Sequence, residues 1–190
     1  MNITWKDVAG WNETYLLGFY ERIIQVLRDD AIFVEMGTYA GQSAIFAGEL
    51  IQKSNKKINF ITLDNGFGSG EEDQQKYIKE SCGGITLAGK VAENIYNAGL
   101  SNHIVQMNCS SEMASKIFPD NYIDIVFIDG SHDSNSVQRD IELWYPKVRV
   151  GGIISGHDYC RTSVSDVVNK ILAQNNLTIF GNIVWYANKT

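Results

Sequence analysis

The sequence predicts a single α/β domain, residues 1–190, folded as a doubly wound, three-layer sandwich around a mostly parallel sheet. Two observations predict this fold. Segments with a helix-like apolar period alternate along the chain with strand-like apolar runs. The strand-like runs are continuously apolar, which is typical of parallel strands that helices cover on both faces. A chain of 190 residues can bury about 70% of its unfolded surface without disulfides or metals.

The elements follow one another as strand–helix–strand units. The amino-terminal segment, residues 1–29, contains an amphipathic helix that we expect Asn12 or Thr14 to cap. Strands are predicted at 31–35, 58–64, 103–107, 123–129 and 152–155, and helices at 42–53, 89–99, 112–117 and 137–144. Right-handed crossovers then place successive strands side by side.

Local residue types delimit the carboxyl-terminal elements. Ser163 and Asp166 have the spacing of a capping box, which predicts that a last helix opens at Ser163. Residues 177–187 form two apolar runs around Gly181 and Asn182, which predicts an antiparallel hairpin.

Residues 33–43, Phe-Val-Glu-Met-Gly-Thr-Tyr-Ala-Gly-Gln-Ser, predict a ligand-binding turn between the first strand and the following helix. Gly37 and Gly41 allow positive φ and close backbone approach, and the first N–H groups of the helix are free to donate. A dinucleotide-binding fingerprint would place a glycine at position 35, where this chain has Glu35. An acid here argues against a pyrophosphate and favours a ligand with positive charge.

Acids follow the first, second, fourth and fifth predicted strands. They are Glu35, Asp64, Asp129 and Asp158. Because ligands of open α/β sheets bind beyond the carboxyl ends of the strands, we expect these acids at one rim. Carboxylates gathered there would bind a cation, a ribose or a metal ion.

Asp64 is expected to lie beside Glu35. The helix at 42–53 runs about 18 Å at ~1.5 Å per residue, and the strand at 58–64 returns about 20 Å at ~3.3 Å per residue. A carboxylate at that place suits hydrogen bonds from ribose hydroxyls. The alternative is that Asp64 only ends its strand and turns into Asn65.

Charge and composition argue against several classes of partner. The net charge is −6 and no basic run exceeds Lys56-Lys57, which excludes nucleic acid and anionic membranes as expected partners. No apolar stretch approaches ~18 residues, and the first residues lack the layout of a secretion signal, so we expect a cytoplasmic protein. Cys82, Cys109 and Cys160 lack metal-type spacing and are expected to be free thiols.

In combination, these motifs resemble class I S-adenosylmethionine-dependent methyltransferases, most closely the small-molecule O-methyltransferases that act on sugars and natural products. The motifs are Glu35-x-Gly37-x-x-x-Gly41, Asp64, Ile-Val-Phe-Ile-Asp-Gly-Ser-His at 125–132 and Gly-Gly-Ile-Ile-Ser-Gly-His-Asp-Tyr at 151–159. The resemblance implies a Rossmann-like, seven-stranded sheet with an antiparallel last strand. It also implies S-adenosylmethionine as the cofactor.

The resemblance further implies the cofactor contacts. The methionine part would be surrounded by Glu35, Gly37, Thr38, Tyr39, Gly41 and Ser43, and the ribose would lie at Asp64 and Asn65, with Asp129 supporting the cofactor. Many relatives have an acid near the adenine amino group in a Gly-Asp-Ser-like turn after the third strand. This chain has Asn108, Cys109 and Ser110 instead. Asn108 or Ser110 would then replace the acid, unless the turn only caps the next helix through Ser110 or Ser111.

Methyl transfer from a sulfonium mainly requires alignment of nucleophile, methyl group and sulfur. A hydroxyl nucleophile also needs its proton removed, by a general base or by a metal ion that lowers its pKa. His132 is the candidate base and Asp129 its catalytic neighbour, and the alternative is that His132 is only a polar loop residue. Ser131-His132-Asp133 is not a hydrolase triad, because adjacent residues of one loop cannot line up as one.

A divalent metal ion is the other route to an activated hydroxyl. By resemblance, Asp129, His157 and Asp158 would hold it, after the fourth and fifth strands. A Mg²⁺ site usually has a third carboxylate, so His157 favours a transition metal or no metal. The alternative is that Asp129 supports its turn and Asp158 caps its loop.

Two segments are expected to shape acceptor choice. Residues 66–86 form an insertion with glycines around a polar helix, which is typical of a lid. Residues 5–15 carry two tryptophans and a tyrosine. The alternatives are a solvated excursion for the insertion and, for the aromatic segment, docking on the core or on a second subunit, as in a homodimer.

The sequence therefore predicts methyl transfer from S-adenosylmethionine to a hydroxyl group of a small molecule, by in-line displacement. The acceptor itself is not specified by the fold. Three alternatives stay open on the same fold: a nucleotide-linked oxidoreductase, a metal-dependent hydroxylase-like enzyme, and a non-catalytic cofactor-binding module.

Overall fold

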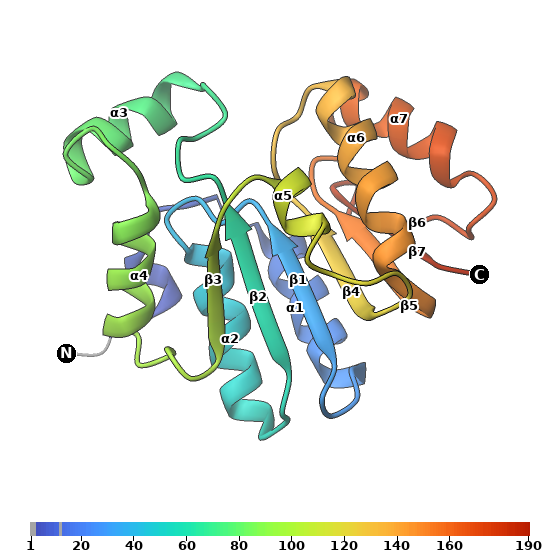
Figure 1. Cartoon of the computed structure of the whole chain (residues 1–190), viewed down its shortest axis with the longest axis horizontal. Coiled ribbons are helices and arrows are strands. Elements are labelled where there is room, and N and C mark those ends of the chain that lie inside the picture. The colour runs from blue at the N-terminus through green and yellow to red at the C-terminus, as the bar shows by residue number, and fades with distance from the viewer. Residues whose placement is uncertain (1–2, 12) are drawn as a thin grey trace.

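The computed structural model describes residues 3–11 and 13–190, so the predicted cap Asn12 lies outside the described residues. Within them, seven strands form one sheet in the order β3-β2-β1-β4-β5-β7-β6 (Figure 1). The strands are β1 (Ile32–Met36), β2 (Asn59–Asp64), β3 (Ile104–Asn108), β4 (Ile123–Ile128), β5 (Val148–Gly156), β6 (Thr178–Phe180) and β7 (Val184–Asn188). Strands β1 to β5 pair in parallel, whereas β7 pairs antiparallel with β5 and with β6. The predicted fold, its antiparallel last strand and the terminal hairpin are confirmed.

Helices cover both faces of the sheet. They are α1 (Thr14–Val26), α2 (Gln42–Ser54), α3 (Glu72–Ser81), α4 (Ala88–Asn97), α5 (Ser111–Ser115), α6 (Ser134–Trp144) and α7 (Thr162–Leu172), with short 3₁₀ turns η1 (Trp5–Asp7) and η2 (Tyr145–Lys147). Helices α1, α2 and α4 share one apolar cluster with the sheet, and α5, α6 and α7 share another. None of the helices in the described ranges is long and apolar enough to span a membrane.

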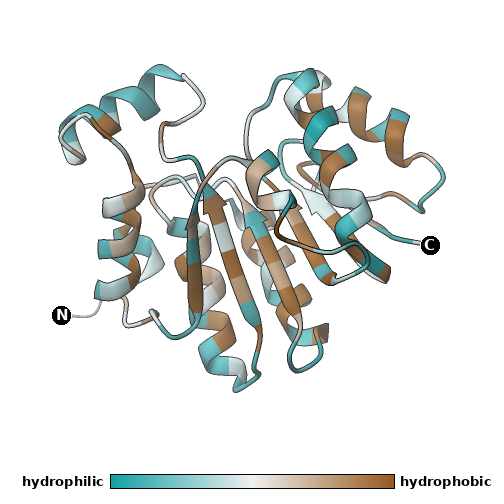
Figure 2. Ribbon diagram, in the orientation of Figure 1, coloured by the Kyte–Doolittle hydropathy of each residue, from teal (hydrophilic) through white to brown (hydrophobic). Residues whose placement is uncertain are grey.

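The two apolar clusters explain why the central strands carry apolar residues on both faces. In β1, Phe33 packs in the cluster of α1 and α2, and the next residue, Val34, packs in the cluster of α6 and α7. Both side chains are fully buried. Figure 2 shows the same contrast, with apolar strands at the centre and a largely hydrophilic α3 at the periphery. The sheet is therefore a rigid platform, and α3 is an addition to it.

Two predicted helix caps are wrong. Thr14 is the first residue of α1, and Glu13 occupies the cap position without a side-chain hydrogen bond. Helix α7 opens at Thr162 after Arg161, so Ser163 lies inside the helix. The Ser163 hydroxyl donates instead to the carbonyl of His132, at 2.7 Å. This long-range contact replaces the capping box and fixes the loop that follows β4.

Strand β5 is longer than predicted. It begins at Val148 and not at residue 152, because its pairing with β4 continues across a register shift between Ile123 and Ile125. The strand ends at Gly156, so His157 and Asp158 project from the same edge as the ends of β1, β2 and β4.

Candidate active site

A cavity of about 530 Å³ opens at the carboxyl ends of the parallel strands. Most of the predicted site residues line it: Gly37, Thr38, Tyr39, Ser43, Asp64, Asn65, Cys109, Ser110, Asp129, His132, His157 and Asp158. Glu35, Gly41 and Asn108 are not among the lining residues. The structure therefore brings three of the four rim acids to one cavity wall and leaves Glu35 beneath it.

The turn between β1 and α2 needs glycine at two positions. Gly37 has a φ of 93° and Gly41, which caps α2, has a φ of 94°. A Cβ atom on Gly37 would overlap the carbonyl group of Asp129. The backbones after β1 and β4 therefore touch, which only a glycine permits.

Glu35 is almost completely buried, with 1% of its surface exposed. Its carboxylate accepts hydrogen bonds from the Tyr20 hydroxyl at 2.8 Å and the Thr62 hydroxyl at 2.6 Å. Thr62 in turn lies 2.6 Å from the Thr38 hydroxyl. Burial raises the pKa of Glu35 to about 7 although these hydrogen bonds oppose the rise. Glu35 thus supports the turn from below, and its predicted contact with the cofactor stays a prediction.

Asp64 lies at the end of β2, two residues beyond Thr62, which is the residue that pairs with Glu35, so the prediction that Asp64 lies beside Glu35 is wrong by two residues. One carboxylate oxygen accepts the N–H of Tyr39 at 3.0 Å, and the other accepts the N–H of Gly66 at 2.7 Å. Each oxygen still has a free lone pair. Asp64 therefore ties the two loops together and keeps the capacity to accept a hydroxyl hydrogen bond from a ligand.

The turn after β3 is a helix cap, which was one of the two interpretations of this segment. The Ser110 hydroxyl accepts the N–H of Met113 and caps α5. The side chain of Asn108 accepts a hydrogen bond from Gln106 at 2.8 Å. Cys109 lines the cavity but offers only a weak acceptor.

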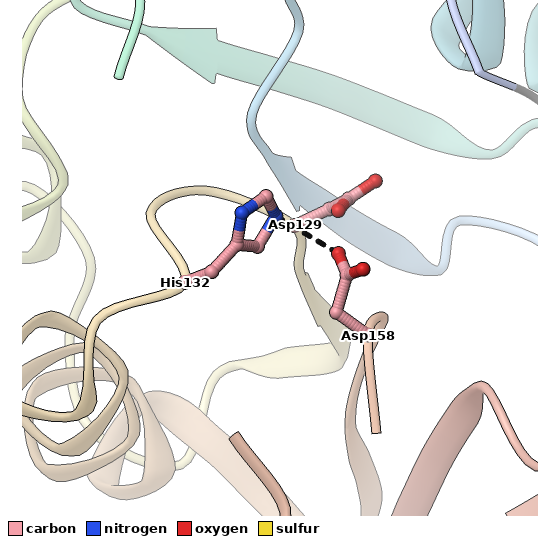
Figure 3. A group of neighbouring side chains, drawn as sticks. All are labelled: Asp129, His132 and Asp158. Atoms are coloured by element: carbon pink, nitrogen blue, oxygen red, sulfur yellow. Dashed lines mark ion pairs between the residues drawn. The ribbon is translucent and has the colours of Figure 1, made fainter. Parts of the chain in front are cut away.

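Asp129, His132 and Asp158 form a compact group, with one potential ligand atom of each within 4.8 Å of the others (Figure 3). His132 Nε2 lies 2.9 Å from a carboxylate oxygen of Asp158. Its other nitrogen, Nδ1, lies 3.3 Å from Glu71, a residue of the 66–86 insertion. Both nitrogens of His132 therefore contact carboxylates.

His157 lies next to this group, although within the described residues it is His132 that completes the three-membered cluster. His157 Nδ1 is 3.2 Å from Asp158 and 3.6 Å from Asp129. Its Nε2 atom is buried and has no hydrogen-bond partner among the described residues. The cluster thus offers one imidazole and two carboxylates to a ligand, and His157 contacts both carboxylates from beside it.

The ionisation of the cluster follows from these contacts. Burial raises the pKa of Asp129 to about 6, against the attraction of His157. Burial would also raise the pKa of Asp158, but hydrogen bonds from His132 and His157 hold it well below its usual range. The hydrogen bond to Asp158 raises the pKa of His132 above that of a free histidine. His132 and Asp158 therefore stabilise each other's charged forms.

The 66–86 insertion reaches the cavity. Gly68, Ser69 and Glu71 line it, and Glu71 makes the contact with His132. The ends of the insertion are joined, because the carbonyl of Gly66 accepts the N–H of Leu87 at 2.9 Å. Closing and opening of this segment as a lid stay a prediction.

The aromatic amino-terminal segment packs on its own chain. Trp5 meets Phe46 edge to face, with ring centroids 5.4 Å apart. Trp11 lies against Tyr39, with centroids 4.8 Å apart, and lines the cavity. This is the predicted docking on the core, and it brings the segment to the cavity mouth.

Residues 34–159 match the sequence model of a family described as a methyltransferase domain. The chain belongs to this family. The methyltransferase domain is 33% identical over 156 residues to an uncharacterised protein of Acanthamoeba polyphaga mimivirus, in a match that covers 77% of this chain and 61% of the viral protein. This chain therefore spans about three fifths of the length of that curated relative.

Solved structures share the fold of the methyltransferase domain. The O-methyltransferase NovP has a TM-score of 0.70 at 19% identity, over 92% of this chain and 79% of NovP. A SAM-dependent O-methyltransferase from Thermotoga maritima has a TM-score of 0.64 at 11% identity, over 96% of this chain and 67% of that protein. The fold is that of class I S-adenosylmethionine-dependent methyltransferases, and it does not define the acceptor.

Proposed function

We propose that this methyltransferase domain transfers the methyl group of S-adenosylmethionine to a hydroxyl group of a small molecule, by in-line displacement. One observation carries the proposal. Asp64, which suits a ribose, and the cluster of Asp129, His132 and Asp158, which suits activation of a hydroxyl, line the same cavity of about 530 Å³. Such a volume is in the range of small-molecule sites.

The cofactor half of the cavity is the wall formed by residues 37–39, 42, 43, 64 and 109–111. Its residues fit the ligand, because Asp64 can accept ribose hydroxyls and the two glycines of the turn at positive φ allow close approach of a ligand to the backbone. Asp64 and Asp129 also give the cavity negative charge, which attracts a sulfonium cation. S-adenosylmethionine, when bound, supplies the activated methyl group.

The acceptor half of the cavity is the wall formed by Glu71, Asp129, His132 and Asp158. A general base needs an unprotonated nitrogen, so His132 must be neutral when it acts, and an acceptor hydroxyl must displace one of its two carboxylate partners. Asp158 is 14% exposed and also paired with Arg161, whereas the Glu71 side chain is 46% exposed. Glu71 is therefore the partner that gives way, and Asp158 orients the ring.

A divalent ion at Asp129, His132 and Asp158 is the alternative way to activate the hydroxyl. One nitrogen and two carboxylates suit Mn²⁺, Fe²⁺ or Zn²⁺ better than Mg²⁺. Glu71, at 3.3 Å from the other ring nitrogen, would then orient the imidazole. Loss of transfer after chelation, restored by Mn²⁺, would support the ion, and unchanged transfer would support His132 as the base.

Composition supports the remaining parts of the proposal. The net charge of −6 supports a small-molecule acceptor over nucleic acid or an anionic membrane. Three free cysteines support a reducing, cytoplasmic location. A homodimer stays a prediction that sedimentation or light scattering would check.

Thermal unfolding with added ligand tests the cofactor. S-adenosylhomocysteine at a hundredfold excess over its Kd should stabilise the protein by about 2.7 kcal/mol and raise the Tm by about 5–10 °C. NAD should leave the Tm unchanged. Stabilisation by NAD alone would instead support the oxidoreductase alternative.

Methyl-labelled S-adenosylmethionine tests the acceptor class. Label should enter low-mass hydroxylated compounds, tested with a catechol, a simple phenol and a hexose. Label that appears only in added RNA or protein would contradict the proposed acceptor class.

A further inference from the structure

Asp140 is a buried acid outside both the glycine turn and the histidine cluster. It lies on α6, with 7% of its surface exposed, and it lines the cavity. Its neighbours Val137, Ile141 and Trp144 form the apolar face of the helix. A carboxylate on such a face is costly unless its oxygens have partners.

Only one of the two oxygens of Asp140 is satisfied within the described residues. Ser111 donates its hydroxyl to Oδ1 at 2.6 Å, and the indole N–H of Trp144 donates to that same hydroxyl at 2.8 Å. No described residue donates to Oδ2, which lies next to Gly130: a Cβ placed there would be 4.0 Å away. Ser111 therefore fixes the orientation of the Asp140 carboxylate at the cavity wall, and its second oxygen remains able to accept a hydrogen bond.

The position of Asp140 fits the part of a nucleoside beyond the ribose. Asp64 ends β2, whereas Ser111, the partner of Asp140, lies 3.4 Å from the sulfur of Met36 at the end of β1. Neighbouring strands are about 5 Å apart, so a ligand whose ribose is held by Asp64 can reach Asp140 with its base.

Other side chains at this end of the cavity are less suited to accept a hydrogen bond. Asn108 is bonded to Gln106 and does not line the cavity. The Ser110 hydroxyl caps α5, and the Cys109 thiol is a weak acceptor. Asp140, which is distant from all three in sequence, is the buried carboxylate here, since the Glu112 carboxylate is exposed and paired with Lys116.

We propose that Asp140 accepts a hydrogen bond from the exocyclic amino group of the cofactor's adenine and so selects adenine over a 6-oxopurine. This inference rests on the proposed function, because it requires a nucleoside cofactor. An amino group donates to the free oxygen, whereas the carbonyl of a 6-oxopurine would face it as a second acceptor and repel it. Asp140 would thus be a specificity-determining residue for the cofactor.

Calorimetric titration with two nucleosides tests the inference. The wild-type protein should bind S-adenosylhomocysteine at least about tenfold more tightly than S-inosylhomocysteine, since a hydrogen bond to a charged group contributes about that factor. In Asp140→Asn the new amide can donate to a 6-oxo group, and Ser111 keeps an oxygen to bond. The ratio of the two affinities should fall to about one or reverse. Glu142→Gln, an exposed acid two residues along the same helix, should leave the ratio unchanged.

Two outcomes would overturn this inference and leave the proposed function standing. One is a wild-type protein that binds both nucleosides equally. The other is an Asp140→Asn variant that keeps the wild-type ratio of the two affinities, whether or not both affinities fall. The first outcome needs no variant and so does not depend on its folding. A wild-type protein that binds neither nucleoside would overturn the proposed function, and the inference with it.

Discussion

Hydrogen bonds from backbone N–H groups hold the cofactor half of the cavity, whereas contacts between side chains hold the acceptor half. In the cofactor half, the Gly37 N–H donates to the Leu63 carbonyl at 2.9 Å and the Tyr39 N–H donates to the Asp64 carboxylate at 3.0 Å. In the acceptor half, His132 is held by the carboxylates of Asp158 and Glu71. The sheet therefore sets the position of the cofactor half, whereas the acceptor half depends on the ionisation of His132 and its two carboxylate partners.

This difference matches the chemical demands on the two halves. A single cofactor can be bound by a preformed site. An acceptor, in contrast, has to enter the cavity and displace a carboxylate that already contacts His132. The two halves should consequently respond differently to substitution.

Gly37→Ala should destabilise the turn of the cofactor half, and with it the fold. Its Cβ would overlap the Asp129 carbonyl at a φ that alanine rarely adopts, so we expect a loss of about 3 kcal/mol in the free energy of unfolding. Urea unfolding measures this. Gly89→Ala on α4, where a Cβ meets nothing within 4 Å, is the matched control and should be neutral or slightly stabilising. Equal effects of the two variants would contradict the proposed backbone contact.

His132→Ala should impair activation of the acceptor and leave cofactor binding unchanged. Without the base or ligand, kcat should fall about a hundredfold or more, while the Kd of S-adenosylhomocysteine stays within about twofold. His103→Ala, outside the cavity, should change neither quantity. A large loss of cofactor affinity in His132→Ala would show that the two halves are not separate.

Glu35→Gln should change the pH dependence of stability that arises from the buried acid beneath the cavity. The folded-state pKa of Glu35, about 7, lies above its value in an unfolded chain, so the stability it contributes is present at low pH and is lost as pH rises towards 7. The wild type should lose about 2–3 kcal/mol between pH 5 and 8 from this group. Glu35→Gln should lack that loss, and identical pH profiles of the two proteins would argue against the buried acid.

Glu71→Gln should have the smallest effect. The contact between Glu71 and His132 is partly exposed, so it contributes less than about 1 kcal/mol. We expect KM for the acceptor to change by up to about fivefold with cofactor affinity unchanged. Glu72→Gln, its exposed neighbour outside the cavity, is the control. A tenfold or larger loss in kcat would mean that Glu71 belongs to the chemistry and does not merely yield to the acceptor.

The cofactor half was largely predictable because its determinants are local. Glycines four residues apart and an apolar run predicted the turn at residues 37–41, and the segment lengths placed Asp64 within two residues of its position in the sheet. Strand ends in a parallel sheet also predicted that Asp129 and Asp158 would meet.

The missed features are contacts between residues far apart in sequence. No local pattern brings Glu71 to His132 or turns Ser163 from a helix cap into a donor for the His132 carbonyl. Asp140 had one detectable signal, an acid three residues after Val137 on an apolar helix face. Its partner Ser111 lies on another helix, so the hydrogen bond between them could not be predicted from the sequence.

The most direct test of the two-half account is the calorimetric Kd of S-adenosylhomocysteine for the wild type, Asp64→Asn, His132→Ala and the exposed control Glu21→Gln. The account predicts that Asp64→Asn weakens binding by about tenfold or more, since it removes a charged acceptor, and that the other two variants bind like the wild type. A wild-type protein without measurable binding, or equal losses in Asp64→Asn and His132→Ala, would contradict it.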